Sequence, residues 1–565
     1  MAKKEIKKYL QEVRKIYSGG DYTEMTYRTS FETLIESFNP EYDLTHEPKR
    51  VTDIGAPDFK AFRGSANIGY IETKNLGENL DNVLESVQLK KYIESFDNII
   101  LTDYARFMLI RNAEKVIDLN LFSIVDLKNS SFTVSDANIK GFLQLIDEFF
   151  NYKQPTIKDA QELAKELARK AKLLKDIVKE QLTEDIRTKD ESRFSPIYDF
   201  HLGIKSLIKD LKIEDGADAY AQTVTYSLFL AKKNFSGDID RITAYSHIPE
   251  HIGIIKQIFT NMSGSEFPSR ISWIIDDIVD ILNATDMKEV FATIDTRGKK
   301  DKDPILFLYE DFLHYYDPKK KKKLGVYYTP RPVVNFIVNS THLILKEHFE
   351  KNTGLADDTV TVLDPAAGTG TFFWITYLVV LNELINKGMR GLIDGKIHNH
   401  LLKNFYGLEL LITPYVISHL ILTDLLKRWH YKWKENDRIQ IYLSNTLEPS
   451  SGETTLMPFM GELRIENIAT ARIKSTQPIL AIIGNPPYAG TSANKGKWIK
   501  DLLKKGYLRA DGSKDDGYYK VDGEKLDEKN PKWLQDDYVK FIRFAQHKID
   551  KNGEGVVAFI TNHSY

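Results

Sequence analysis

The last 240 or so residues of the chain alternate short apolar runs with helical stretches. From Leu324 onward five runs have the composition of buried β-strands, and their sequences are TVTVLDPAAG, NFYGLEL, IQIYLSNTL, ILAIIGNPPY and GVVAFITN. Strands that alternate with helices form a parallel sheet covered on both faces. We therefore expect a Rossmann-like, doubly wound α/β domain over 319–565, with its ligands at the carboxyl ends of the strands.

Two further regions precede this domain. Residues 1–150 mix helical and strand-like patterns, and we expect an α/β domain there. Residues 151–318 begin with IKDAQELAKELARKAKLLKDIVKEQL, whose apolar residues recur every three or four positions among dense charges. This pattern predicts an all-α connector. The run Lys319–Lys323 follows it, either as a solvated loop or as a contact to phosphate.

Composition narrows the class of protein. The 565 residues suffice for three or four domains of about 150 residues. Lys and Arg total 78 against 80 Asp and Glu, so a non-specific coat on nucleic acid is disfavoured while a local basic cleft remains possible. The absence of cysteine excludes disulfides, Cys-bound zinc, iron–sulfur clusters and thiol catalysis. No secretory signal or membrane span is expected, which favours a cytoplasmic protein.

A candidate ligand site follows the first of the five runs. Residues 362–373 read strand, glycine-containing turn and helix, but only Gly368 and Gly370 are present, so this is not the dinucleotide pattern. Small residues at a strand end let the backbone close around a ligand. Glu409 ends the next run and can accept hydrogen bonds from both ribose hydroxyls, or it is an ordinary surface glutamate.

The tetrapeptide Asn485-Pro486-Pro487-Tyr488 follows the fourth run. The two prolines fix the backbone just beyond a strand, so the Asn485 amide and the Pro486 carbonyl can be held rigidly. Both can accept hydrogen bonds from an exocyclic amino group, and Tyr488 offers a face on which a base can stack. A base presents that group only after flipping out of the duplex. The alternative is a purely structural turn.

These motifs together resemble the amino-methylating DNA methyltransferases of the N6-adenine class. GVYYTP at 325–330 is similar to the segment that precedes the donor motif in that family, and the order of the motifs corresponds to the gamma arrangement. The resemblance implies that Thr329 touches the carboxylate of S-adenosylmethionine and that Glu409 holds its ribose. Asn445 stands where the family usually has an acid near the donor adenine. The donor motif itself would bind the methionine part through Asp364, Pro365, Ala366, Gly368, Gly370 and Phe372.

A second constellation lies near the amino terminus. Asp58 follows Pro57, and Glu72 and Lys74 stand two positions apart in the strand-like run IGYIETKN, so they share a face. An antiparallel neighbour carrying Asp58 would bring two carboxylates and an ammonium together, a set that suits Mg²⁺. Gln88 and Tyr92 form an i, i+4 pair on the following helix. The alternative is a solvated strand face.

This set resembles the PD-(D/E)xK nucleases, in the version with a Q-x-x-x-Y motif. The resemblance implies that Asp58 and Glu72 bind the metal and that Lys74 is catalytic, while Gln88 and Tyr92 brace the site or touch DNA. Glu32 is a candidate for an additional acid.

The combination resembles the fused Type IIG restriction–modification enzymes, which act on double-stranded DNA. The sequence contains no G-x-x-x-x-G-K-[ST] motif, so it gives no sign of a translocating ATPase. We expect no target-recognition domain within the chain. Either a separate polypeptide then supplies it, or the chain is the amino-terminal portion of a split or truncated enzyme. Three alternatives stay open: a solitary adenine methyltransferase with an inactive nuclease domain, an inert truncated subunit of a phage-defence assembly, and an RNA methyltransferase.

Overall fold

In the computed structural model the chain forms two compact units. The N-terminal unit comprises Met1–Lys158, Arg169–Glu180 and Pro268–Asp286, and the C-terminal unit comprises Asp159–Ala168, Gln181–Phe267 and Met287–Tyr565. The structure describes residues 2–46, 57–64, 66–153, 155–188, 195–248, 252–264, 267–296, 303–318, 329–449, 458–488, 494–527 and 532–561. The predicted lysine run Lys319–Lys323 and residues 325–328 lie outside these ranges.

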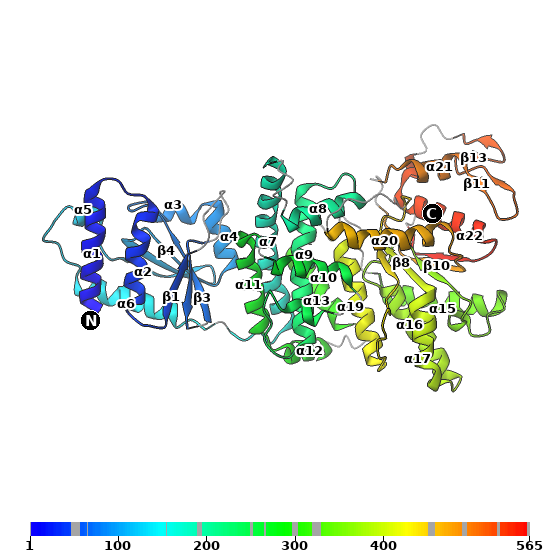
Figure 1. Ribbon diagram of the computed structural model, residues 1–565, viewed down its shortest axis with the longest axis horizontal. Helices are drawn as coiled ribbons and strands as arrows, with labels where there is room; N and C mark the ends of the chain where they lie inside the picture. Colours follow the sequence, from blue (N-terminus) through cyan, green and yellow to red (C-terminus); the bar gives the residue numbers. More distant parts are fainter. Residues whose placement is uncertain are drawn as a thin grey trace. The chain divides into compact units, whose positions relative to one another are not determined.

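The N-terminal unit is built on a six-stranded sheet with the strands in sequence order (Figure 1). Its strands are β1 (Tyr42–His46), β2 (Phe59–Arg63), β3 (Ala66–Thr73), β4 (Asn98–Thr102), β5 (Arg106–Arg111) and β6 (Glu114–Asn120). All neighbours are antiparallel except β3 and β4, which are parallel. A parallel pair needs a crossover, and here α3 (Leu80–Leu84) and α4 (Val87–Ser95) provide it.

Aromatic side chains form the core beneath this sheet. Phe31 stacks on Phe107 at 5.8 Å between ring centroids, and Phe107 lies 4.8 Å from Phe142. All three are fully buried, and they join α2 (Arg28–Glu36) and α6 (Asp136–Phe150) to β5. The helices that cover this core are α1 (Ala2–Gly19), the short turn η1 (Glu24–Tyr27), α2 (Arg28–Glu36), α5 (Ile124–Leu127) and α6 (Asp136–Phe150).

The stretch predicted as a connector is mainly helical where it is described, yet it does not form a unit of its own. Its helices are α7 (Ala160–Thr188), α8 (Pro196–Leu207), α9 (Ile213–Asn234), α10 (Gly253–Ser263), α11 (Ser269–Asn283), α12 (Met287–Thr296) and α13 (Pro304–Tyr316). Residues Arg169–Glu180 and Pro268–Asp286 group with the N-terminal unit and the other helices with the C-terminal unit.

A buried polar cluster explains why two helical segments belong to the N-terminal unit. Lys170 on α7 donates to Asp277 on α11 at 2.5 Å, and Tyr70 on β3 donates to the same carboxylate. Burial alone would raise the pKa of Asp277, but the nearby Lys170 and Lys60 outweigh it and lower the pKa. Removing either helix would leave a buried charge without its partner, which is costly.

The C-terminal unit contains the predicted doubly wound sheet. All five apolar runs are strands: β7 (Val362–Asp364), β8 (Phe405–Glu409), β9 (Ile441–Leu443), β10 (Ala481–Gly484) and β15 (Val556–Phe559). They are parallel, in the order β15-β10-β7-β8-β9. The chain therefore runs from β7 outward to β9 and then returns to β10 on the other side. The switch point lies between β7 and β10, where such sheets bind their ligands.

Helices connect these strands and cover both faces of the sheet (Figure 1). The larger ones are α15 (Arg331–His348), α16 (Thr371–Asn386), α19 (Ile412–Arg428), α20 (Pro458–Ser475) and α22 (Asp537–Asn552). Between β8 and α16 lie α17 (Ile393–Lys396), a π-helical turn (Ile397–Leu401) and α18 (Leu402–Asn404). After β10 come α21 (Lys497–Lys505) and the short strands β11 (Tyr507–Leu508), β12 (Lys514–Asp515), β13 (Lys520–Val521) and β14 (Glu524–Lys525).

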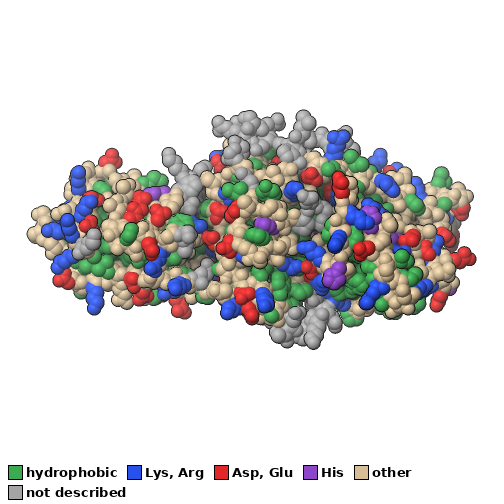
Figure 2. All heavy atoms as spheres, turned by 60° about the horizontal axis from the view of Figure 1, so that its bottom comes forward, with side chains coloured by type: hydrophobic (Ala, Val, Ile, Leu, Met, Phe, Trp, Pro, Cys, Tyr) green, Lys and Arg blue, Asp and Glu red, His purple; other side chains and the backbone are tan. Residues whose placement is uncertain are grey.

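The described surface agrees with the balanced composition. Basic and acidic side chains are interspersed over the face shown in Figure 2. No helix within the described ranges is both long and apolar enough to cross a membrane.

Candidate functional site

A cavity of about 580 Å³ opens at the carboxyl ends of the strands in the C-terminal unit. Its volume is typical of sites that bind cofactor-sized molecules. Most of the residues singled out in this half of the sequence line it, although they come from segments up to 160 residues apart. These lining residues are Thr329, Pro365, Ala366, Gly368, Phe372, Glu409, Asn445, Asn485 and Pro487.

The turn after β7 closes around the cavity through Glu409. The Gly368 N–H donates to Glu409 Oε2 at 2.8 Å, and the Leu411 N–H donates to Oε1 at 2.7 Å. Gly368 has a φ of +54° and Gly370, which precedes α16, has a φ of +80°, a region that favours glycine. Burial raises the pKa of Glu409 while these N–H groups oppose the rise. Each carboxylate oxygen keeps a lone pair with which it can accept from a ligand hydroxyl.

Asp364 lies behind the cavity wall rather than in it. Its Oδ1 accepts from the Ala366 N–H at 3.0 Å, and a Cβ on Gly484 would come within 2.6 Å of the same oxygen. No described group donates to Oδ2, which is buried. Burial raises the pKa of Asp364 to about 8. An unpaired buried oxygen of this kind is costly to the fold, and a raised pKa reduces that cost by keeping the carboxyl protonated.

Asn485 presents an unsatisfied acceptor to the cavity. Its Nδ2 donates to Thr329 Oγ1 at 3.2 Å, which fixes the plane of the amide. Oδ1 is buried and has no hydrogen-bond donor among the described residues. Pro486 is buried, Pro487 lines the cavity, and Tyr488 is half-buried outside the lining. The structure thus places the amide oxygen of Asn485 at the cavity, just beyond the end of β10.

The loop after β9 is held by a buried lysine. Lys474 Nζ, on α20, donates to Ser444 Oγ at 2.8 Å, to Asn445 O at 2.7 Å and to Glu448 O at 2.9 Å. Burial lowers the pKa of Lys474 to about 7. The amide of Asn445 is also engaged, because its Oδ1 accepts from the Leu447 N–H and its Nδ2 donates to Asn494.

Sequence reasoning missed one wall of the cavity. Leu306, Tyr309, Glu310 and Leu313 on α13 line it, together with residues 207–210 at the end of α8. Burial raises the pKa of Tyr309 above its usual value, and the nearby Glu409 adds to the rise. These helices lie in the stretch interpreted as a connector. Their apolar spacing is that of any packed helix, so the sequence carries no signal for this role.

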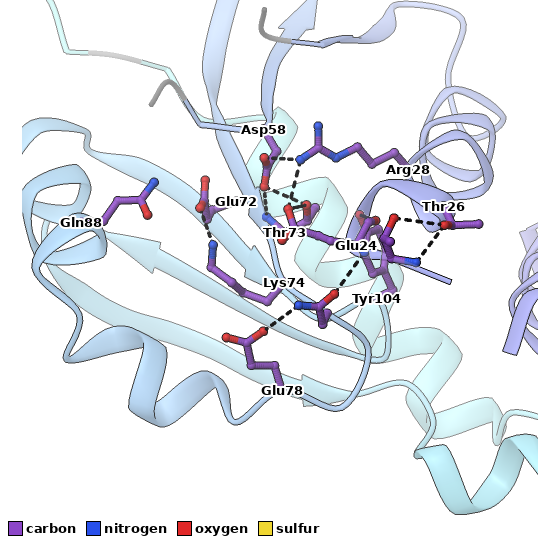
Figure 3. A network of polar contacts seen from close by, with 12 residues as sticks. Glu24, Thr26, Arg28, Asp58, Glu72, Thr73, Lys74, Glu78, Gln88 and Tyr104 are labelled. Carbon is purple, nitrogen blue, oxygen red and sulfur yellow. Dashed lines mark hydrogen bonds and ion pairs between the residues drawn. The ribbon is translucent and has the colours of Figure 1, made fainter. Parts of the chain in front are cut away.

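The structure also brings the amino-terminal constellation together. In the antiparallel pair β2–β3, Phe59 is opposite Ile71, so Asp58 reaches the position beside Glu72. Glu72 accepts from Lys74 Nζ at 2.6 Å. Asp58 and Glu72 are 3% and 1% exposed, which excludes a solvated strand face. Figure 3 shows the two acids and the lysine near one another, where β2 begins and β3 ends.

A protein cation already neutralises Asp58. Arg28, the first residue of α2, donates to Asp58 Oδ1 and also to Glu24 at 3.0 Å. Asp58 Oδ2 accepts from the N–H and the hydroxyl of Thr73, each at 2.7 Å. The Thr73 hydroxyl is also within 3.2 Å of Glu24 (Figure 3). Arg28 and Glu24 were not predicted, because a tertiary contact alone joins their helical turn to this strand.

The remaining predicted residues of this constellation divide into two groups. Gln88 Nε2 donates to the hydroxyl of Tyr92 at 3.1 Å, so the expected pair forms on α4. Glu32, the candidate additional acid, has no hydrogen bond to this cluster among the described residues. Its carboxylate pairs instead with His46 at 2.9 Å. Within the described ranges, no group of three or more His, Asp and Glu side chains is arranged to hold a metal ion.

The comparisons with known proteins agree with the C-terminal geometry. Residues 300–521 match the family model described as N-6 DNA Methylase. This part of the chain is therefore an N6-adenine DNA methyltransferase domain. No curated protein sequence matches the chain.

Two solved structures with a similar fold are those of restriction–modification enzymes. One is the ATP-dependent Type ISP enzyme LlaBIII bound to DNA, with a TM-score of 0.52 and 20% identity over 76% of this chain and 27% of that one. Another is a nuclease-deletion mutant of the Type ISP enzyme LlaGI, with a TM-score of 0.51 and 21% identity over 75% of this chain and 31% of that one. A DrdV–DNA complex matches with a TM-score of 0.47 and 22% identity over 100% of this chain and 50% of that one. The chain spans half or less of each of these proteins.

Proposed function

We propose that this protein is a restriction–modification enzyme that methylates adenine N6 in double-stranded DNA. The observation that carries the proposal is the unsatisfied, buried Oδ1 of Asn485 at the cavity rim. An orphaned buried acceptor costs free energy unless a ligand completes it, and the exocyclic amino group of adenine is a donor of the right kind. The methylase family match of residues 300–521 supports the same assignment.

The cavity also suits S-adenosylmethionine. The cofactor supplies a methyl group that its sulfonium already activates. Glu409 would hold the ribose through the lone pairs that Gly368 and Leu411 leave open. The donor motif from Pro365 to Phe372 would surround the methionine part, with Thr329 near its carboxylate and the buried carboxyl of Asp364 beneath. Asn445 would contact the adenine edge.

The protein's contribution to methyl transfer is positioning and charge stabilisation. A flipped adenine would donate its amino protons to Asn485 Oδ1 and to the carbonyl of Pro486, which draws the nitrogen lone pair out of conjugation with the ring. Both acceptors also stabilise the positive charge that develops on nitrogen. Tyr488 would supply the stacking face. No acid–base step is required before transfer, because alignment of the two reactants provides most of the acceleration.

The test is transfer of tritium from labelled S-adenosylmethionine into adenine N6 of unmethylated phage DNA. Asn485→Ala should lower the rate by about 10²–10³-fold, the usual effect of removing one preorganised partner, and should leave donor affinity by calorimetry unchanged. Asn339→Ala removes an exposed amide from α15 in the same unit and should behave as wild type. Equal rates for both variants would contradict the proposal.

A second activity, DNA cleavage, rests on the Asp58–Glu72–Lys74 cluster. Its chemistry fits Mg²⁺, which takes one or two protein carboxylates and keeps its waters. Asp58 and Glu72 would hold the ion, which would supply charge neutralisation at the phosphate, and Arg28 would have to release Asp58. Lys74 would orient the attacking water, and Gln88 and Tyr92 would brace the site or contact DNA.

Cleavage is tested by nicking of unmethylated supercoiled DNA with and without Mg²⁺. Glu72→Ala should abolish Mg²⁺-dependent nicking, whereas Glu78→Ala, an exposed glutamate nearby (Figure 3), should not. Methylation without any nicking would favour a solitary methyltransferase with an inactive nuclease domain. Donor binding without methylation would favour target recognition by a separate polypeptide, or an inert subunit of a phage-defence assembly.

A further inference from the structure

The α21 helix begins at the mouth of the methyltransferase cavity. Asn494, Lys495 and Gly496, which immediately precede it, line the cavity. Asn494 Oδ1 accepts from Asn445 at 3.1 Å, and its carbonyl accepts from Lys540 Nζ at 2.6 Å. The start of the helix is therefore tied both to the loop after β9 and to α22.

One face of α21 is apolar and buried, and the other is basic. Ile499, Leu502 and Leu503 are buried, and Leu502 belongs to the hydrophobic core that includes Phe541 and Phe544 of α22. Figure 1 shows α21 and α22 in the same part of the C-terminal unit. Residues 494–505 contain five lysines and a single acid, Asp501. Such a local charge is hidden by the near-neutral total.

Three of these lysines form a row along the helix. Lys497, Lys500 and Lys504 stand at i, i+3 and i+7, so they share a face. Their Cα atoms span about 10 Å along the axis at 1.5 Å per residue, which is close to the rise of three base pairs. Lys497 and Lys504 are exposed, and Lys500 is half-buried.

The row is not neutralised by the protein's own carboxylates. Asp501 pairs instead with Lys505 at 3.0 Å. Lys504 lies 5.4 Å from the ring centroid of Tyr519, and none of the three row lysines has an ion pair among the residues described. Burial lowers the pKa of the neighbouring Lys540. The carboxylate of Asp537 opposes that shift, and the positive charge of Lys500 adds to it. Positive charge is thus concentrated beside the cavity, where an anionic partner would relieve it.

We propose that Lys497, Lys500 and Lys504 bind the DNA backbone phosphates that flank the flipped adenine. The inference rests on the proposed methyltransferase function, because a base that enters the cavity must bring its neighbouring phosphates to the mouth. Contacts of this kind set position and affinity without reading sequence. They also release counterions, so binding weakens as salt rises.

The test measures how duplex binding depends on salt, using fluorescence anisotropy with duplexes from unmethylated phage DNA. The triple variant Lys497→Gln, Lys500→Gln, Lys504→Gln should reduce the magnitude of the log K against log salt slope by about 2–3, since each phosphate contact contributes about 0.9. The matched control replaces Lys4, Lys7 and Lys8, exposed lysines of α1, by Gln. It removes the same charge and should keep the wild-type slope.

Methyl transfer and calorimetry on the same proteins separate the possible failures. If the triple variant keeps the wild-type slope, the inference is overturned, and wild-type methyl transfer would leave the proposed function standing. If the slope falls but wild type transfers no methyl group, α21 is a DNA-binding helix and the proposal that this chain by itself methylates DNA fails. If the wild-type chain binds no duplex at all, both are overturned. Unchanged donor affinity in the triple variant shows that the cavity remains intact.

Discussion

Arg543 should be the residue on which the packing of the segment after β10 most depends. Its side chain is fully buried. The guanidinium donates to Leu502 O at 2.9 Å, to Gln546 Oε1 at 3.0 Å and to the carboxylate of Asp515. It thereby joins α22 to both α21 and β12. The guanidinium carbon also lies about 4.5 Å from the ring of Tyr507 and 4.7 Å from that of Tyr518.

Arg543→Met keeps much of the volume and removes the charge. The change leaves Asp515, which is 8% exposed, without its main partner. Breaking one side of a buried ion pair costs about 3–5 kcal/mol. Arg509 contacts the same carboxylate at 3.3 Å, but its side chain is 37% exposed. Arg509→Met should therefore cost about 0–1 kcal/mol, and this makes it a matched control.

The assay is native-state hydrogen exchange over residues 497–527, combined with urea unfolding. Arg543→Met should speed exchange of this segment while the strands β7 and β8 stay protected, and Arg509→Met should change neither. Burial would raise the pKa of Asp515, but the hydrogen bond and charge of Arg543, the Gly517 N–H and the charge of Arg509 together lower the pKa. The ion pair therefore stabilises the fold above the ordinary carboxylate range and is lost as pH falls through the lowered pKa. Equal losses of unfolding free energy in the two variants would refute this reasoning. So would a difference between them that does not shrink as the pH falls into the acid range.

Three further predictions concern the cavity. Burial lowers the pKa of Lys474 from 10.5 to about 7. Between these values the folded state binds fewer protons than the unfolded state, so the free energy of unfolding should rise with pH. Urea unfolding at pH 7 and 9 should show this rise in wild type and a smaller rise in Lys474→Met. Glu409→Gln should weaken S-adenosylmethionine binding by about 10–100-fold in calorimetry, because charged acceptors contribute about 1.5–3 kcal/mol; an unchanged affinity would remove Glu409 from the donor site. Gly370→Ala places a Cβ 3.0 Å from Ser418 Cβ at a φ of +80°. It should therefore lower the free energy of unfolding, measured in urea, by about 1–2 kcal/mol. An unchanged free energy of unfolding would show that this turn relaxes.

Several features of the fold follow from short stretches of sequence. Each of the five apolar runs is a strand, because a continuous run of large apolar residues between turn signals is stable only when both faces are covered. The glycines of the donor turn and the prolines after Asn485 act through their own backbone restrictions, so their geometry is predictable without knowledge of distant residues.

Other features were decided only by tertiary packing. Arg28 reaches Asp58 across 30 residues of sequence, and Glu24 joins the cluster through Arg28. Nothing in their local pattern distinguishes these two residues from surface charges. Tyr309 lines the cavity because α13 packs beside the sheet of the C-terminal unit. A helix's apolar spacing shows that a face is buried without showing what it is buried against.

The sequence by itself therefore determined which strand each motif follows, which residues form the two candidate sites and what chemistry those residue types can perform. Tertiary structure alone decided which helices belong to which unit, which helices line the cavity and which cations neutralise the buried acids. The physical reason is that propensity and backbone restriction act over a few residues. Burial, by contrast, is settled by the whole chain at once, and it determines where a charge such as Asp277 or Asp515 can find its partner.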